Sequence, residues 1–148
     1  MSHKYAIEGQ TAAGTTLTIL ELVGVSTRRA WIEYLSISSD ATPADVTTEF
    51  NVIRGTVSGT GTAVTPRALD PNNPAAVLSA ERGTFTGQTK TASSAMLNVA
   101  VHQRSTYQWY ATPGGEFIVP ATADNWIGIE SIASGGTPNI NAGIIYRE

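Results

Sequence analysis

The sequence contains no cysteine, which excludes disulfide bonds, thiol nucleophiles and thiolate metal sites. It has two histidines, His3 near the start and His102 at the end of a predicted strand. No acidic residue lies near His102 in the sequence. We therefore interpret His102 as a partly exposed structural residue, and not as part of a catalytic triad or a metal site. The sequence predicts no catalytic residue, no metal site and no cofactor.

Charged residues are also scarce: they make up 14% of the chain, whereas about 25% is usual. The nine basic residues are scattered, with Arg28 and Arg29 as the only adjacent pair, and the net charge is −3. Because there is no basic stripe, nucleic acid is not an expected partner. No run approaches the roughly 18 apolar residues of a membrane-spanning helix, so no membrane contact is expected. Such a polar, weakly charged surface suits packing against other proteins.

Helix signals are poor. Only the stretch 74–82, PAAVLSAER, has a helical composition, and it predicts a short helical turn that ends at Gly83. Elsewhere apolar residues alternate, and turn clusters rich in Gly, Asn and Pro recur about every ten residues. The strongest strand candidates are 29–38, 46–54, 95–102, 106–111, 116–119, 126–132 and 140–146, with weaker ones at 4–8, 15–20, 62–68 and 84–90. This spacing predicts an all-β fold, an antiparallel sandwich or barrel with little helix.

Segment 29–38, RAWIEYLSIS, has apolar residues on both parities: Trp31, Leu35 and Ile37 on one, Ile32 and Tyr34 on the other. This double pattern indicates either a strand that is covered on both faces or a strand that contains a β-bulge.

A chain of 148 residues suits one domain. We expect residues 1–14 to form an N-terminal arm or an edge strand, and residues 15–148 to form a single β-sandwich domain. His3, Tyr5 and Ile7 share one parity. They could therefore anchor one face of an added strand, with Lys4 and Glu8 more exposed.

The stretch 68–76, ALDPNNPAA, can be interpreted in two ways. Asp70, Asn72 and Asn73 could offer oxygens to calcium, but the spacing of an EF-hand loop is absent. Asx side chains also cap turns, and prolines stiffen the path of the chain. We predict a structural corner that requires no metal.

With these segments in place, the chain resembles the small jelly-roll decoration (cement) proteins of tailed-bacteriophage capsids. The resemblance runs over nearly the whole chain and rests on structural stretches. These are TAAGTTLTILEL, RAWIEYLSISS, EFNVIRGT, ALDPNNPAA, QWYATPGGEFIVPATADNWIGI and NAGIIYRE. Trp126 departs from the family pattern, in which a small residue often precedes the Ile-Gly-Ile strand.

The resemblance implies a jelly-roll fold and a non-enzymatic virion protein on the outer capsid surface. Such a protein would bind the expanded capsid and stabilise it by bridging subunits of the major capsid protein. It also implies self-association, as a homotrimer or alternatively a dimer. The expected capsid or oligomer contacts are His3, Tyr5, Ile7 and Trp126. If Ile127 and Ile129 pack inward, Trp126 lies on the other face of its strand, either as an outward anchor or beneath a neighbouring loop.

Three alternatives stay open. A glycan-binding module could stack sugars on Tyr107, Trp109, Tyr110 or Trp126, unless Trp109 is core and Tyr110 lies on the opposite strand face. A glycosidase needs only two carboxylates, which can be remote in sequence. A tail or neck component of a phage could have the same fold.

Overall fold

The computed structural model describes residues 2–14, 16–40, 42–134, 136 and 138–148. Met1 of the expected N-terminal segment, Thr15 at the start of the expected domain, and Ala41, Gly135 and Thr137 in the turn clusters lie outside the described residues. The described part of the chain contains thirteen strands and no helix. The prediction of an all-β fold is confirmed.

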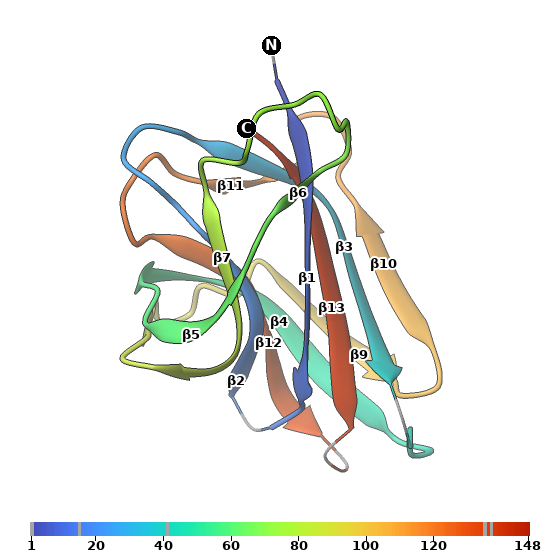
Figure 1. The fold of residues 1–148 in the computed structure, drawn as a ribbon. Coiled ribbons are helices and arrows are strands. Elements are labelled where there is room, and N and C mark those ends of the chain that lie inside the picture. Colours follow the sequence, from blue (N-terminus) through green and yellow to red (C-terminus); the bar gives the residue numbers. More distant parts are fainter. Residues whose placement is uncertain (1, 15, 41, 135, 137) are drawn as a thin grey trace.

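The strands form two antiparallel sheets that face each other (Figure 1). Sheet A contains β1 (Lys4–Ala12), β3 (Ala30–Asp40), β6 (Arg67–Ala68), β10 (Thr106–Tyr110), β11 (Phe117–Val119) and β13 (Asn139–Arg147). Sheet B contains β2 (Leu17–Val23), β4 (Thr47–Val57), β5 (Thr60–Val64), β7 (Ser79–Thr86), β8 (Thr89–Lys90), β9 (Leu97–His102) and β12 (Trp126–Ser134).

Eight of these strands have the topology of a jelly roll. Their pairs are nested in sequence: β1 pairs with β13, β2 with β12, β3 with β10, and β4 with β9. The chain is therefore a long antiparallel hairpin. It is rolled up so that β3 also pairs with β13, and β4 also pairs with β12. The prediction of a jelly-roll sandwich is confirmed.

Residues 58–96, at the tip of this long hairpin, form an insertion between β4 and β9. The insertion contains four further strands, β5, β6, β7 and β8. β7 pairs with β2 and β5 pairs with β7, so these two strands extend sheet B, and β8 pairs with β4. β6 crosses to the other layer and pairs with β1 at Tyr5 and Ala6. The insertion thus adds to both sheets of the sandwich.

The core lies between the sheets and is filled by the inward-facing residues of the strands. The bulge predicted as one explanation of segment 29–38 is present in β3. The pairing of β3 with β13 shifts register between Ile32 and Tyr34, which leaves Glu33 as the extra residue. Ile32 and Leu35, on opposite parities in the sequence, can therefore both point into the core.

The stretch 68–76 forms the predicted structural corner. The backbone N–H of Asn72 donates to Asp70 Oδ1 at 2.9 Å, and the N–H of Asn73 donates to the Asp70 carbonyl at 3.0 Å. This is the local capping expected of an Asx turn.

The corner is clasped by both ends of the chain. The Tyr5 hydroxyl donates to the Pro74 carbonyl at 3.0 Å. The Glu148 carboxylate accepts from the backbone N–H groups of Val77, at 2.7 Å, and Leu78, at 3.2 Å. These tertiary contacts explain why the helical turn predicted over 74–82 is wrong. In such a helix the Leu78 N–H would donate to the Pro74 carbonyl, but Glu148 accepts from this N–H and the Tyr5 hydroxyl donates to this carbonyl. The chain instead enters β7 at Ser79.

We expect Glu148→Ala to lower the free energy of unfolding by roughly 1–3 kcal/mol, because it leaves two backbone donors without their acceptor. Urea denaturation measures the change. Glu8→Ala is the control, since Glu8 is exposed and a surface change usually stays within about 0.5 kcal/mol. Equal, small effects of the two substitutions would show that Glu148 does not hold the corner.

Candidate binding surface on sheet A

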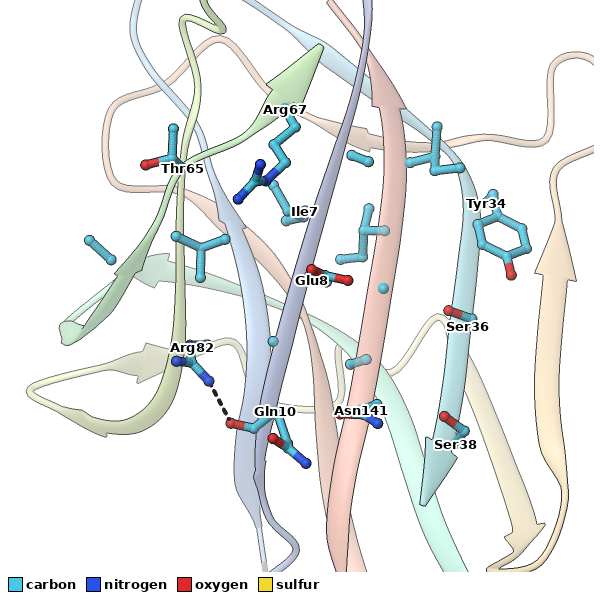
Figure 2. Close-up of a pocket in the computed structure, with 18 residues that line it drawn as sticks. Ile7, Glu8, Gln10, Tyr34, Ser36, Ser38, Thr65, Arg67, Arg82 and Asn141 are labelled. Carbon is cyan, nitrogen blue, oxygen red and sulfur yellow. Dashed lines mark hydrogen bonds between the residues drawn. The ribbon is translucent and has the colours of Figure 1, made fainter. Parts of the chain in front are cut away.

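The outer face of sheet A carries short, polar side chains. Along β1, Tyr5 and Ile7 point into the core, so the alternate residues point outward. Glu8 of β1 and Asn141 of β13 are exposed, and Ser36 of β3 is half-buried beside them. Figure 2 shows these side chains spread over three neighbouring strands. This part of the face therefore offers hydrogen-bond donors and acceptors, with Glu8 as its charged side chain.

A wall from the insertion turns this face into a hollow. Ala63, Val64, Thr65 and Arg67 line one side, and β1, β13 and β3 line the floor and the other side (Figure 2). The hollow has a volume of about 840 Å³. Arg82 of β7 closes one part of it, since its Nη1 donates to the carbonyl of Gln10 at 3.1 Å. The lining is thus built from segments that are remote in sequence.

The other end of the same face is aromatic. Tyr34 and Tyr110 lie with ring centroids 4.8 Å apart, and Tyr110 is 66% exposed. They line a second hollow of about 660 Å³ together with Leu69 and Pro113. Tyr34 and Ile145 line both hollows, so the two form one continuous surface. We call this surface, the outer face of sheet A with both hollows, the sheet A surface.

Ion pairs brace the aromatic end. Arg147 Nε lies 2.9 Å from Glu33 Oε1, and Lys4 Nζ lies 2.6 Å from Glu33 Oε2. The Arg147 guanidinium also stacks 4.5 Å from the centre of the Trp31 ring, and its Nη2 lies 3.4 Å from Glu116 Oε1. The pKa of Glu116 is lowered, first by a hydrogen bond from its own backbone N–H and then by Arg147. The long side chains at this end are therefore held in place.

The outer face of sheet B differs, because the insertion covers the part of it around Glu21 and Glu130. Glu21 of β2 is fully buried, and its Oε2 accepts from Gln88 Nε2 at 2.6 Å. Gln88 in turn accepts from the Thr18 hydroxyl at 2.8 Å. Lys90 binds Glu130 and donates to the carbonyl of residue 16 at 2.7 Å. These polar contacts fasten residues 86–91 onto sheet B.

Burial raises the pKa of Glu21 to about 8, and the neighbouring Glu81 carboxylate raises it further against the lowering effect of Gln88. Glu21 is thus largely protonated at neutral pH, in a place that substrate cannot reach. Its role in the structure is to hold the insertion, and no pattern in the sequence distinguishes it from the other eleven acidic residues.

The structure corrects the predicted contact roles of Tyr5 and Ile7. Both lie in the core, with exposed fractions of 1% and 3%, and Tyr5 stacks on Tyr146 at a centroid distance of 5.6 Å. Tyr5 and Ile7 do lie on the same face of β1, but this face packs into the core of their own sandwich. His3 Nδ1 lies 2.8 Å from Asn73 Oδ1, so it packs against the corner.

Trp126 lies on the outer face of sheet B, as alternation from the buried Ile127 and Ile129 requires, but it is not an outward anchor. It is 1% exposed, and its Nε1 donates to the Val57 carbonyl at 2.9 Å. The ring packs over Gly55, where a Cβ atom would come within 2.2 Å of it. The alternative, burial beneath a neighbouring segment, is therefore what the structure shows.

Two further residue sets from the sequence have clear positions. His102 Nε2 lies 3.1 Å from Asp45 Oδ1, a carboxylate remote in sequence, and both side chains are exposed. Trp109 packs against the core and stacks on Phe117 at 4.4 Å, whereas Tyr110 points outward. This confirms that Trp109 and Tyr110 lie on opposite strand faces.

Within the described ranges, no group of three acidic or histidine side chains is placed to hold a metal ion. The same ranges contain no helix that is long and apolar enough to cross a membrane.

No protein-family model matches the chain, and no curated protein matches it. Among solved structures, it is similar to a chain of Desmodium yellow mottle tymovirus, with 10% identity, a TM-score of 0.38 and coverage of 99% of this chain and 86% of that one. A chain of turnip yellow mosaic virus gives 8% identity, a TM-score of 0.31 and coverage of 99% and 79%. A chain of infectious bursal disease virus, Gt strain, gives 12% identity, a TM-score of 0.22, and coverage of 99% of this chain and 40% of that one. TM-scores below 0.5 carry no information about what this chain does.

We expect the stability of the protein to fall as the pH rises from about 4.5 to about 8. In this window the folded state keeps a proton on Glu21 that the unfolded state has released, so each pH unit costs up to about 1.4 kcal/mol from this group. Glu21→Gln removes this dependence and should be more stable than the parent at pH 8. Urea denaturation at several pH values tests this, and parallel profiles for the two proteins would contradict it.

We also expect Gly55→Ala to lower the free energy of unfolding by roughly 1–3 kcal/mol or more, because the new methyl group meets the Trp126 ring and the Thr89 carbonyl. Gly14→Ala is the matched control, since its nearest contact, Leu17 Cδ2 at 3.4 Å, is ordinary. Thermal denaturation of both variants makes the comparison. A small effect at Gly55 would show that this packing is loose.

Proposed function

We propose that this chain is a non-enzymatic virion protein that binds the outer surface of an expanded phage capsid and stabilises it by bridging major capsid subunits. The observation that carries the proposal is the contrast between the two sheets. Residues 86–91 cover the part of sheet B around Glu21, whereas the sheet A surface is open and combines short polar side chains with a few charged ones. The sequence resemblance to jelly-roll decoration proteins supports the same assignment.

The chemistry of the sheet A surface suits contact with protein. Tyrosine is enriched at protein–protein interfaces, and Tyr110 offers an exposed ring beside Leu69, which is 52% exposed. Short serine and asparagine side chains pay little entropy on binding. The braced ion pairs of Arg147 fix the surroundings of this ring in advance.

Self-association as a homotrimer, with a dimer as the alternative, belongs to the same proposal. Three weak contacts held in one assembly act at high effective concentration, so a trimer would stay attached although each contact is weak. Light scattering at micromolar protein concentration measures the oligomeric state.

The test is to mix purified protein with expanded empty capsids and to image them by electron microscopy. We expect the parent protein to decorate the capsids and to raise the temperature at which they break. Tyr110→Ala should weaken decoration about tenfold or more, as expected for an exposed aromatic anchor that contributes at least about 1.4 kcal/mol. Val57→Ala is the matched control, an exposed apolar side chain on sheet B. Absence of decoration by the parent protein would end the proposal.

One observation favours a second function, glycan binding. The tilted Tyr34 and Tyr110 rings lie next to the polar part of the hollow, where Ser36 and Asn141 could bind sugar hydroxyls. A glycan array separates the two functions, because a capsid protein of the proposed kind would bind no glycan on it.

A further inference from the structure

The backbone of β1 has a defined hydrogen-bonding direction at each residue. The His3 N–H donates to the Glu148 carbonyl and the Glu148 N–H donates to the His3 carbonyl, both at 3.0 Å. In an antiparallel pair, such mutual pairs recur at every second residue. Odd-numbered residues of β1 therefore direct both backbone groups to β13. The even-numbered residues, among them Glu8 and Gln10, direct theirs to the opposite edge of the strand.

This opposite edge is only partly used. The Leu69 N–H donates to the Lys4 carbonyl at 2.9 Å, and β6 pairs with Ala6. Further along, the Gln10 carbonyl accepts from Arg82. Within the described part of the chain, the N–H and carbonyl of Glu8 and the N–H of Gln10 have no partner. They are spaced as the next strand of a sheet would require.

The hollow of about 840 Å³ runs along this edge (Figure 2). Arg67 and Arg82 line its wall, as Figure 2 shows. The Arg67 residue is exposed, and although its backbone pairs with Ala6, its guanidinium makes no hydrogen bond or ion pair with any described residue. The Glu8 side chain lies on the outer face of the sheet. An extended segment beside Glu8 and Gln10 would therefore meet two guanidinium groups along its other side.

We propose that the free edge of β1 at Glu8 and Gln10 is a strand-addition site for an extended segment of a partner protein that carries a carboxylate side chain. The backbone of the segment pairs with the N–H and carbonyl of Glu8 and with the N–H of Gln10, and its carboxylate lies against Arg67 and Arg82. Strand addition takes its affinity from main-chain hydrogen bonds and its specificity from side chains. Identifying the partner as the major capsid protein rests on the proposed function.

The edge is suited to this role because little protects it against pairing. Natural edge strands are blunted by proline, by charged side chains, especially lysine, or by a covering segment. Here the segment 7–12 contains no proline or lysine and Glu8 is its one charged residue, the pairing of β6 with β1 stops at Ala6, and Arg82 covers only the carbonyl of Gln10. The two arginines favour an acidic segment and disfavour a basic one. A second copy of β1 would instead bring its own Glu8 to the same edge, next to another Glu8.

The test compares proline variants in the capsid decoration assay, each first shown to fold by circular dichroism. Glu8→Pro removes the outward N–H, a change that edge strands tolerate because the ladder to β13 is not touched. We expect at least a tenfold loss of binding. Glu8→Ala keeps the N–H and should bind within about twofold of the parent, which separates the backbone from the side chain.

The matched control is Gln108→Pro at the other edge of sheet A. The Ala111 N–H donates to the Glu33 carbonyl at 2.8 Å, so Gln108, on the other parity of β10, directs its N–H away from β3. This variant should bind as the parent does. If Glu8→Pro binds as tightly as the parent, or if Gln108→Pro loses as much as Glu8→Pro, the proposal is wrong. If Glu8→Pro changes the oligomeric state and leaves capsid binding intact, the edge pairs with a second copy, which also overturns it.

Charge reversal supplies a test that does not depend on proline. Arg67→Glu should weaken capsid binding tenfold or more, whereas Arg54→Glu, an exposed arginine on sheet B, should leave it unchanged. Equal effects of the two reversals would refute the acidic segment. If the parent protein itself does not bind capsids, the proposed function fails. The strand-addition site is then tested alone, by pull-down with a synthetic seven-residue peptide of alternating valine and glutamate. If the parent and Glu8→Pro capture this peptide equally well, the strand-addition proposal is wrong.

Discussion

The position of β13 between β1 and β3 is the constraint on which the rest of the structure depends. This strand, last in sequence, pairs with the first strand at nine positions and with β3 along its other side. It therefore closes the long hairpin into a roll and brings the two ends of the chain together at the corner 68–76. Once β13 is in place, Tyr5 and Tyr146 stack in the core, and Glu148 can reach the backbone of Val77 and Leu78.

The insertion between β4 and β9 then makes the two faces of the sandwich unequal. Its residues 86–91 lie on sheet B through the Glu21–Gln88 contact, and Val57, the last residue of β4 before the insertion, accepts the hydrogen bond of Trp126. Its other part, Ala63 to Arg67, forms a wall beside sheet A without covering it. One loop thus covers part of one face and shapes the other, and this difference is the reason for placing the proposed partner surface on sheet A.

Much of the fold could be predicted from the sequence, and less of the surface. Alternation and turn residues are local, so the strands, the bulge in β3 and the Asx corner were accessible. The partners of buried residues are not local. Trp126 is covered by a segment some seventy residues away in sequence, and its pairing with Gly55 leaves no mark except a glycine within a strand. The chemistry of Glu21 depends on burial by a loop, which its sequence context does not indicate.

The antiparallel pairing of β1 and β13 also has a mechanical consequence. Positions 3 and 148 lie at the same end of the two paired strands, joined by two backbone hydrogen bonds. A force that pulls these positions apart acts on one pair at a time, beginning with His3 and Glu148, so that the strands open like a zipper. A force directed along β1 against sheet A instead loads the hydrogen bonds of the β1–β13 ladder together, in shear. The two directions of load therefore act on the same ladder in different ways.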